Sequence, residues 1–291
     1  MPRHLVPNSN TATLLVACPD KPGLVLALSQ FIFENGGNII DSDQYTDRDA
    51  GLFFMRLCWD LTHFKIPSDQ IYKALLPLKE HNAISAHLFF SKHKPQVAVF
   101  ASKSMHCLYD LLMEEKQGSL AGNIGLVVSN HKEAREVAQH FAVPFEYLPV
   151  SENNKASVEQ TQKKLLAEHG IELIVLARYM QVLSPLFAEE WKNRIINIHH
   201  GFLPAFQGAK PYHQAHDRGV KIIGATAHYV TSELDQGPII VQAVGPVTHR
   251  DSVPELIRKG RDLERRVLTG AVRLHLQHRI MVADARTIVF E

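Results

Sequence analysis

The feature that most restricts the fold of this chain is a single change in hydrophobic pattern at residues 91–95. Before this polar segment, apolar residues follow the spacing of strands and helices in the order β-α-β-β-α-β. After it, short apolar runs alternate with amphipathic segments, which is typical of a parallel sheet whose strands are joined by helices. A polar segment that ends in proline favours a domain boundary. The sequence therefore predicts two domains, at residues 11–90 and 95–291.

The first domain is predicted to be a ferredoxin-like βαββαβ unit. A helix is expected from Leu24, where apolar residues recur at helical spacing, and the glycines Gly36 and Gly37 are expected to end it. A second helix is expected over residues 68–81, with Ser68 as its N-cap. The expected strands cover residues 14–18, 38–45, 52–61 and 86–90.

The second domain is predicted to be a doubly wound α/β fold with a mostly parallel, Rossmann-like sheet. Short apolar runs predict buried strands, and a strand pair is expected at 221–230 and 238–244. The buried strands are expected at residues 97–101, 124–129, 173–177 and 195–198, and helices at 108–115, 132–141 and 158–168.

A long last helix is predicted over residues 254–277. Ser252 and Glu255 form a capping-box pattern at its start. Two acidic residues are interleaved in its basic cluster, which predicts a solvated face rather than a phosphate site. These residues are Arg258, Lys259, Arg261, Asp262, Glu264, Arg265 and Arg266.

Composition excludes several classes of function. The formal net charge of +1 argues against nucleic-acid and membrane partners. The 3 cysteines are scattered, so neither a disulfide framework nor a metal site is expected. No apolar run approaches the roughly 20 residues of a membrane span, and residues 1–10 lack the apolar core of a signal peptide. A soluble, cytoplasmic protein is therefore expected.

Two polar clusters stand where an α/β sheet binds ligands. Asn197 and His199 lie at the end of a predicted strand, two residues apart, so they share one face of the sheet. Asp235 lies in a tight turn between two apolar strands. An amide, an imidazole and a carboxylate suit the attack of water on a carbonyl, because the last two move a proton and the amide binds the oxyanion. Spacing alone also permits a structural histidine and an ordinary aspartate turn.

The residues around these clusters resemble a known family. Residues 196–213 read Ile-Asn-Ile-His-His-Gly-Phe-Leu-Pro-Ala-Phe-Gln-Gly-Ala-Lys-Pro-Tyr-His, with Gly-Ala-Thr-Ala-His-Tyr-Val at 224–230 and Leu-Asp-Gln-Gly-Pro-Ile-Ile at 234–240. These motifs are similar to the formyltransferase fold that uses 10-formyltetrahydrofolate. The resemblance implies a catalytic triplet of Asn197, His199 and Asp235. It leaves open whether His228 supports the triplet or is a structural strand histidine.

The same resemblance implies a folate site that needs no cofactor and no metal. The stretch Leu-Ala-Arg-Tyr-Met-Gln-Val-Leu-Ser-Pro at 176–185 matches the folate-binding segment of that fold. The loop ahead of Asp235 is implied as a second contact for the pterin. The implied substrate-binding residues of the segment are Arg178, Met180, Gln181, Val182 and Leu183.

The first domain resembles an ACT domain, because Cys-Pro-Asp-Lys-Pro-Gly-Leu-Val at 18–25 matches its first strand-to-helix turn. An ACT domain joined to a formyltransferase fold is similar to the formyltetrahydrofolate deformylases, in which water is the acceptor. The first strand of the second domain is followed by no glycine-rich phosphate loop, which agrees with that acceptor. Lys103 and His106 are then expected on the acceptor side, although a structural role for both stays open.

The ACT resemblance also implies regulation and assembly. It predicts a homo-oligomer, a dimer or tetramer, that binds a small amino acid, glycine or methionine, as effector. A purely structural role of this domain in the oligomer stays open. The implied effector-site residues are Asp20, Gly23, Gly36 and Gly37.

Two departures from the deformylase pattern keep other functions open. Gly201 stands where that family usually has serine, and Lys210 where asparagine is common. The alternatives are a formyltransferase to an amine or amino sugar, and a folate or amino-acid sensor without catalysis. Release of formate without an added acceptor would separate the first from a deformylase, and folate binding without turnover would indicate the second.

Overall fold

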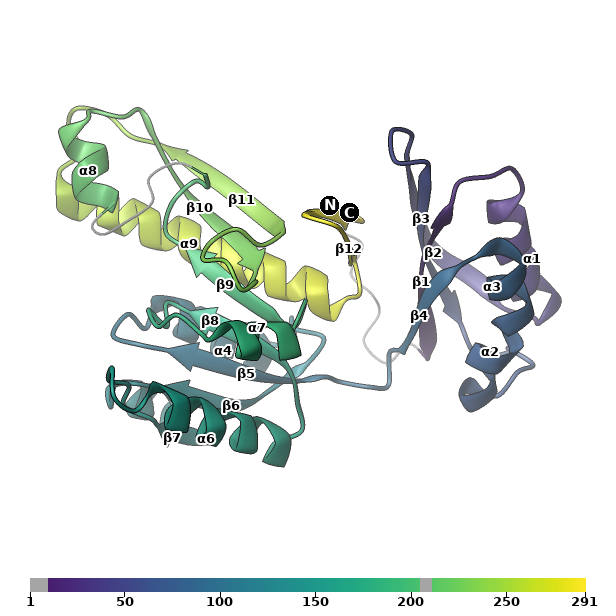
Figure 1. Cartoon of the computed structure of the whole chain (residues 1–291), viewed down its shortest axis with the longest axis horizontal. Coiled ribbons are helices and arrows are strands. Elements are labelled where there is room, and N and C mark those ends of the chain that lie inside the picture. Colours follow the sequence, from purple (N-terminus) through teal and green to yellow (C-terminus); the bar gives the residue numbers. More distant parts are fainter. Residues whose placement is uncertain (1–9, 205–210) are drawn as a thin grey trace. The chain divides into compact units, whose positions relative to one another are not determined.

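A computed structural model describes residues 10–204 and 211–291, which divide into two compact units. The first unit extends to Lys94 and also includes residues 278–281 and 288–291. The second unit comprises residues 95–277 and 282–287. Both units are α/β, as the sequence predicts, and each is described by itself (Figure 1).

The first unit is a four-stranded antiparallel sheet with helices on one face (Figure 1). The strand order is β2-β3-β1-β4, which is the order that a βαββαβ chain forms. Side chains of β1 and β3, among them Leu14, Val16 and Trp59, pack with Leu28 and Ile32 of α1 to form its core. The elements are β1 (Thr11–Pro19), α1 (Leu24–Glu34), β2 (Asn38–Asp47), β3 (Leu52–Asp60), α2 (Ser68–Ala74), α3 (Leu76–Asn82) and β4 (Ser85–Phe90).

Two local features of this unit have clear causes. The helix expected at 68–81 is two short helices, because Pro77 near the start of α3 has no amide hydrogen to continue the first one. Gly37, just after α1, packs so closely that a Cβ there would lie 2.6 Å from Cγ2 of Ile32. Gly36 has a φ of 77°, which favours glycine. These two glycines therefore serve the helix end and the core beneath it.

The last residues of the chain pack on the first unit, which no sequence pattern predicts. Asp41 of β2 accepts hydrogen bonds from Arg56 of β3 at 2.6 Å and from Arg279 at 2.8 Å. Nε of Arg56 also donates to the carbonyl oxygen of His278 at 3.0 Å. The ring of His278 stacks on Phe89 of β4, with centroids 3.7 Å apart. The carboxy-terminal residues thus belong to the structure of the amino-terminal unit.

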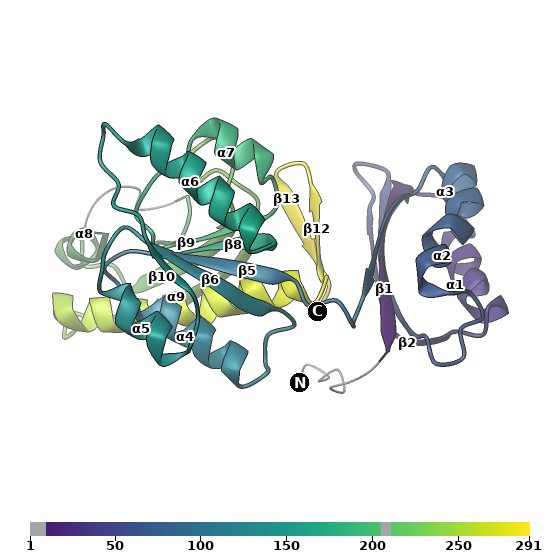
Figure 2. The same cartoon turned by 90° about the horizontal axis from the view of Figure 1, so that it is seen from below.

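The second unit contains a seven-stranded sheet of order β11-β10-β9-β8-β5-β6-β7. The strands from β9 to β7 are parallel to one another, and β10 and β11 are antiparallel additions. Helices α6 and α7 cover one face of the sheet, and α4, α5 and α9 cover the other (Figure 2). The strands are β5 (Gln96–Ala101), β6 (Asn123–Ser129), β7 (Phe145–Tyr147), β8 (Ile171–Ala177), β9 (Ile195–His199), β10 (Ile222–Tyr229) and β11 (Ile239–Pro246).

Three short elements of the second unit are not predicted by the sequence: the strand β7 and the helices α7 and α8. Each spans fewer than eight residues, too few to repeat a helical or strand period several times. The same applies to the terminal hairpin of β12 (Ile280–Ala283) and β13 (Arg286–Val289). The helices are α4 (His106–Lys116), α5 (Ala134–His140), α6 (Lys155–Glu168), α7 (Pro185–Glu190), α8 (Pro211–Asp217) and α9 (Val253–Leu276).

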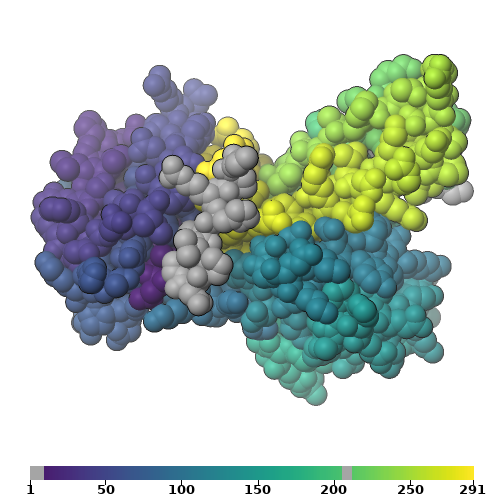
Figure 3. All heavy atoms as spheres, turned by 180° about the vertical axis from the view of Figure 1, so that it is seen from behind, coloured from purple at the N-terminus to yellow at the C-terminus, as the bar shows by residue number. Residues whose placement is uncertain are grey.

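Helix α9 begins as the sequence predicts, with both hydrogen bonds of the Ser252–Glu255 capping box formed. It lies beside α4 on the face seen from behind, where α9 is yellow and α4 blue (Figure 3). Glu264 of this helix is 1% exposed, so the prediction that it belongs to a solvated face is wrong. None of the helices in residues 10–204 and 211–291 has both the length and the apolar character needed to cross a bilayer.

Candidate functional site

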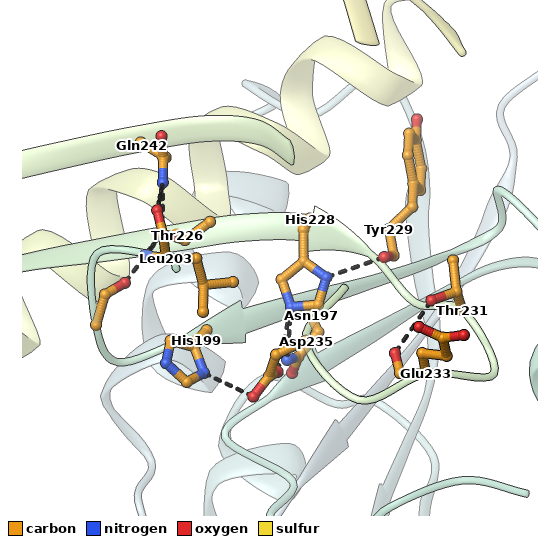
Figure 4. Close-up of polar contacts among 11 residues, drawn as sticks. Asn197, His199, Leu203, Thr226, His228, Tyr229, Thr231, Glu233, Asp235 and Gln242 are labelled. Atoms are coloured by element: carbon orange, nitrogen blue, oxygen red, sulfur yellow. Dashed lines mark hydrogen bonds and ion pairs between the residues drawn. The ribbon is translucent and has the colours of Figure 1, made fainter. Parts of the chain in front are cut away.

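The predicted catalytic residues come together around the end of β9, a central strand of the sheet. Asn197 and His199 lie two residues apart on β9 and face the same side. The neighbouring strand β10 is antiparallel, and its register sets His228 opposite Asn197. Three of the four polar side chains of the site therefore sit on rigid sheet positions (Figure 4).

The fourth residue, Asp235, is brought in by the connection between β10 and β11. Its φ of 57° places it in the left-handed region, which aspartate adopts more readily than most residues. Gly237 packs so tightly that a Cβ there would lie 1.7 Å from the carbonyl oxygen of Tyr229. Only glycine permits this return of the chain, and the return points Asp235 at the two histidines (Figure 4).

Asp235 contacts both histidines. Its Oδ2 lies 3.1 Å from Nδ1 of His199, and its Oδ1 lies 3.5 Å from Nε2 of His228. The bond from His199 is the largest of the effects that hold the pKa of Asp235 well below its usual range, and it opposes the effect of burial. Asp235 is consequently a carboxylate at neutral pH, and Nδ1–H of His199 donates a hydrogen bond to it.

His228 is fixed in one tautomer by its backbone partner. Its Nδ1 lies 2.9 Å from the carbonyl oxygen of Tyr229, which can only accept, so Nδ1 carries the hydrogen. In the neutral ring Nε2 then accepts from the side-chain amide of Asn197 at 3.2 Å. This bond orients the amide of Asn197 beside the His199–Asp235 pair (Figure 4). His228 is 2% exposed and acts on the site through Asn197 and Asp235.

The loop after His199 is tied to the sheet by hydrogen bonds. Oγ1 of Thr226 donates to the carbonyl oxygen of Gly201 at 2.9 Å, and Nε2 of Gln242 donates to that of Leu203 at 3.1 Å (Figure 4). Gly201, where the family pattern has serine, is buried in this loop. Lys210, the other departure, lies outside the described residues.

The segment that follows β8, expected to bind folate, divides into buried and exposed residues. Met180 and Val182 are 62% and 55% exposed, so their apolar side chains are open to a ligand. Gln181 is half-buried, and Leu183 packs partly against the core of the sheet. Arg178 differs from these four, because its side chain is only 15% exposed and points to a carboxylate in the interior.

That carboxylate is Glu264 of α9, the centre of a set of contacts that sequence reasoning missed. Oε2 of Glu264 accepts a hydrogen bond from Nε2 of His106 at 2.8 Å, and Oε1 accepts one from the hydroxyl of Tyr212 at 2.7 Å. Nε of Arg178 lies 3.6 Å from Oε2. We call His106, Arg178, Tyr212 and Glu264 the Glu264 cluster. Its members come from four separate segments, so no local motif could reveal it.

The contacts of the Glu264 cluster favour the ionised form of Glu264. Burial by itself would raise the pKa of Glu264, but the bond from His106, the charge of Arg178 and the bond from Tyr212 together bring it below the usual value. The ring of His200 lies between this cluster and the catalytic residues, with its centroid 5.4 Å from His199 and 6.4 Å from Tyr212. Burial first, and then the charge of Arg178, lower the pKa of His200 to about 4, so this imidazole is neutral.

His106 and Glu264 also lie with Cys107 in a group whose possible metal-ligand atoms are within 4.8 Å of one another. A cation is disfavoured there, because both oxygens of Glu264 accept hydrogen bonds and the guanidinium of Arg178 is 3.6 Å away. Burial raises the pKa of Cys107, which disfavours the thiolate that a metal needs. Lys103, the other residue expected on the acceptor side, is exposed on the loop between β5 and α4.

The first unit contains an open hollow of about 350 Å³ at the start of α1. Asp20 and Gly23, two of the expected effector residues, line it, whereas Gly36 and Gly37 lie at the other end of α1. Polar side chains from the sheet complete the hollow. The whole lining is Asp20, Lys21, Gly23, Leu24, Val25, Leu26, Gln44, Thr46 and Phe53.

Comparison with known proteins agrees with the division of the chain into two units. The formyl transferase family model matches residues 95–272, and the ACT domain model matches residues 12–58. A formyltetrahydrofolate deformylase from Synechocystis sp. is 51% identical, with 96% of this chain and 98% of the relative covered. One from Bacillus subtilis is 46% identical, with 97% and 95% covered. The crystal structure of a formyltetrahydrofolate deformylase from Pseudomonas syringae superposes with a TM-score of 0.95 at 40% identity, covering 98% of this chain and 96% of that chain. The chain belongs to the formyltetrahydrofolate deformylase family.

Proposed function

We propose that this protein hydrolyses 10-formyltetrahydrofolate to formate and tetrahydrofolate at the end of β9. The observation that carries the proposal is the contact between Oδ2 of Asp235 and Nδ1 of His199, at 3.1 Å, beside the amide of Asn197. A carboxylate, an imidazole and an amide are the groups needed to activate water and to bind an oxyanion. The deformylase relatives, at up to 51% identity over nearly the whole chain, support this reaction.

His199 is the group that we expect to take the proton from water. Asp235 accepts from Nδ1 of His199, so that the other ring nitrogen, Nε2, is free of a hydrogen and available as a base. The low pKa of Asp235 makes the carboxylate itself a weak base. Water therefore loses a proton to His199 while its oxygen bonds to the formyl carbon, and Asp235 stabilises the imidazolium that results.

Asn197 is expected to bind the oxyanion that forms on the formyl oxygen. Its amide has two hydrogens, and one of them is directed at His228, which leaves the second for the substrate. Collapse of the tetrahedral intermediate breaks the bond between the formyl carbon and N10. His199 returns its proton to N10, so that formate and tetrahydrofolate leave. Exposed Met180 and Val182 are expected to contact the pterin, with Gln181 and Leu183 beside them.

The direct test is to incubate the purified protein with 10-formyltetrahydrofolate alone and to measure formate and tetrahydrofolate. We expect equal amounts of both products. Turnover that needs an added amine would instead make the protein a formyltransferase, and folate binding without turnover would make it a sensor. We expect no cofactor and no metal to be required, so that EDTA leaves the rate unchanged. Formate made in this way in the cytoplasm would supply purine synthesis and balance the one-carbon pools.

We also propose that the hollow at the start of α1 binds a small amino acid that regulates the enzyme. Lys21 can pair with a carboxylate and Asp20 with an ammonium group, and both line the hollow. Glycine and methionine are the expected effectors. Homo-oligomerisation, to a dimer or tetramer, is supported by Leu26 and Phe33 of α1, which are 69% and 79% exposed.

Titration of the full-length enzyme with glycine and methionine tests the regulatory proposal. Asp20→Asn should weaken the response, whereas Asp49→Asn, which changes an exposed aspartate outside the hollow, should not. Equal responses of the two variants would show that the amino acid does not bind in the hollow. Light scattering after size-exclusion chromatography gives the oligomeric state with and without the amino acid.

A further inference from the structure

We propose that Arg178, held in place by Glu264, donates a hydrogen bond to the attacking water and thereby selects water over amines as the acceptor. The inference rests on the proposed hydrolysis and explains why that reaction would not become formyl transfer. It changes the role of Arg178 from folate binding to the acceptor side of the site.

The register of the sheet places Arg178 beside the reacting centre. Leu176 of β8 pairs in parallel with Asn197 of β9. Arg178 follows directly after β8, and His199 is the last residue of β9, so both lie at the same edge of the sheet, at the ends of neighbouring strands that are about 4.8 Å apart. The charge of Arg178 lowers the pKa of His200, and His200 adjoins His199, which agrees with this placement.

Arg178 has donors to spare. Its Nε and Nη1 are buried and have no hydrogen-bond partner among the residues that the structure describes, although Nε lies 3.6 Å from Glu264 in an ion pair. Leaving such donors buried costs free energy, so an acceptor is expected to meet them during function. The backbone of Arg178 has a φ of 62°, an uncommon conformation for a residue other than glycine. The guanidinium lies beside Glu264, and the side chain of Arg178 is only 15% exposed.

A hydrogen-bond donor such as Arg178 distinguishes water from an amine by the number of their lone pairs. A water oxygen has two lone pairs, so it can accept a hydrogen bond from Arg178 with one and attack the formyl carbon with the other. A primary amine has a single lone pair, which it cannot use for both at once. An amine in its ammonium form is also repelled by the guanidinium charge. The neutral ring of His200 adds no competing charge at this place.

The two acceptors differ in the bond that forms, but the same bond breaks. With water, a carbon–oxygen bond forms, the bond from carbon to N10 breaks, N10 gains a proton and formate leaves with release of one proton. With an amine, a carbon–nitrogen bond forms instead, N10 gains the proton that the amine loses, and a formamide leaves. The ratio of formate to formamide therefore measures the selection directly.

The experiment follows both products from 10-formyltetrahydrofolate in the presence of glycinamide, a small amine that is largely uncharged in mildly alkaline buffer. We expect the wild-type protein to form formate alone. Arg178→Ala should release formate about 10–100-fold more slowly and raise the ratio of formylglycinamide to formate by at least about tenfold. Glu264→Gln, which loosens Arg178 without removing it, should shift the ratio in the same direction by less. Arg273→Ala, which removes an arginine ion pair with Glu114 elsewhere on α9, is the matched control and should leave the ratio unchanged.

Thermal unfolding and folate binding of each variant are measured in parallel. An unchanged product ratio in Arg178→Ala would overturn the inference, since a structural role alone slows the reaction without changing the acceptor. A folded, folate-binding Arg178→Ala protein that forms neither product would overturn it as well, because loss of a selecting group must leave the amine reaction open. If the wild-type protein releases no formate, it is the proposed hydrolysis that fails.

Discussion

Two carboxylates of the second unit, Asp235 and Glu264, have similar partners but different surroundings. Each is bonded to an imidazole, Asp235 to His199 and Glu264 to His106. Asp235 comes from a turn and keeps 16% of its side chain exposed, whereas Glu264 comes from the middle of α9 and is 1% exposed. Both oxygens of Glu264 accept hydrogen bonds from other elements, which links the loops after β5, β8 and β9.

The difference suggests separate tasks for the two carboxylates. A carboxylate at an accessible imidazole suits proton transfer, because the ring can gain and lose a proton with little movement. A sealed carboxylate with a buried guanidinium suits the fixing of loops, and removal of one partner leaves a buried charge uncompensated. Substitution of Asp235 should therefore act mainly on the reaction, and substitution of Glu264 should act strongly on stability as well.

The largest effect is expected from Asp235→Asn. Loss of the carboxylate removes the group that holds the proton on Nδ1 of His199, and in a comparable carboxylate–imidazole pair such a change lowers kcat by about 10⁴-fold. Formate release gives the rate, and a folate-binding titration shows that the site is still formed. Asp284→Asn changes an exposed aspartate that also has a left-handed backbone, in the turn between β12 and β13, and should have no effect. More than about a tenth of the wild-type rate in Asp235→Asn would mean that Asp235 does not support the base.

Glu264→Ala should lower the free energy of unfolding of the second unit by about 3–5 kcal/mol, because Arg178 then keeps a buried charge without its partner. Urea denaturation followed by tryptophan fluorescence can isolate this unit. The chain has 2 tryptophans, and in a Trp59→Phe background only Trp191 of the second unit reports. In the same background, Asp235→Asn should lower the free energy of unfolding much less than Glu264→Ala does. Equal losses in the two variants would contradict the division of tasks.

Asn197→Ala should lower kcat by about 10²–10³-fold with a smaller change in KM, if its amide binds the oxyanion. Steady-state kinetics of formate release separate the two parameters. A change in KM alone would make Asn197 a residue that binds the substrate in its ground state.

The smallest effect is expected from Gly201→Ser. A serine hydroxyl next to the loop after His199 should leave the rate unchanged or raise it by up to about tenfold, the value of one good hydrogen bond. The rate of formate release with saturating substrate is the measurement. A large drop would show that the buried loop around Gly201 has no room for a hydroxyl.

The sequence predicted those parts of the molecule whose signals are local. Strand alternation placed Asn197 and His199 on one face, and the Ser252–Glu255 pattern located the start of α9. The roles of the catalytic residues remain predictions, although the structure brings them together. The Glu264 cluster could not be predicted, because its members are far apart in sequence and Glu264 is surrounded by charged neighbours that do face solvent. The break at Pro77 was missed because helical spacing continues across it.

The packing of residues 278–281 on the first sheet sets an order for synthesis. Arg56 and its hydrogen-bond partner His278 are 222 residues apart, and Asp41 and Arg279 are 238 apart. A ribosome that adds about 5–20 residues each second needs roughly 10–45 s to make that length. During this time the first sheet has emerged but lacks the last residues that cover it. The amino-terminal unit is thus the first to be made and the last to be completed, so a protein cut near Lys94 would separate the sheet from the residues that cover it.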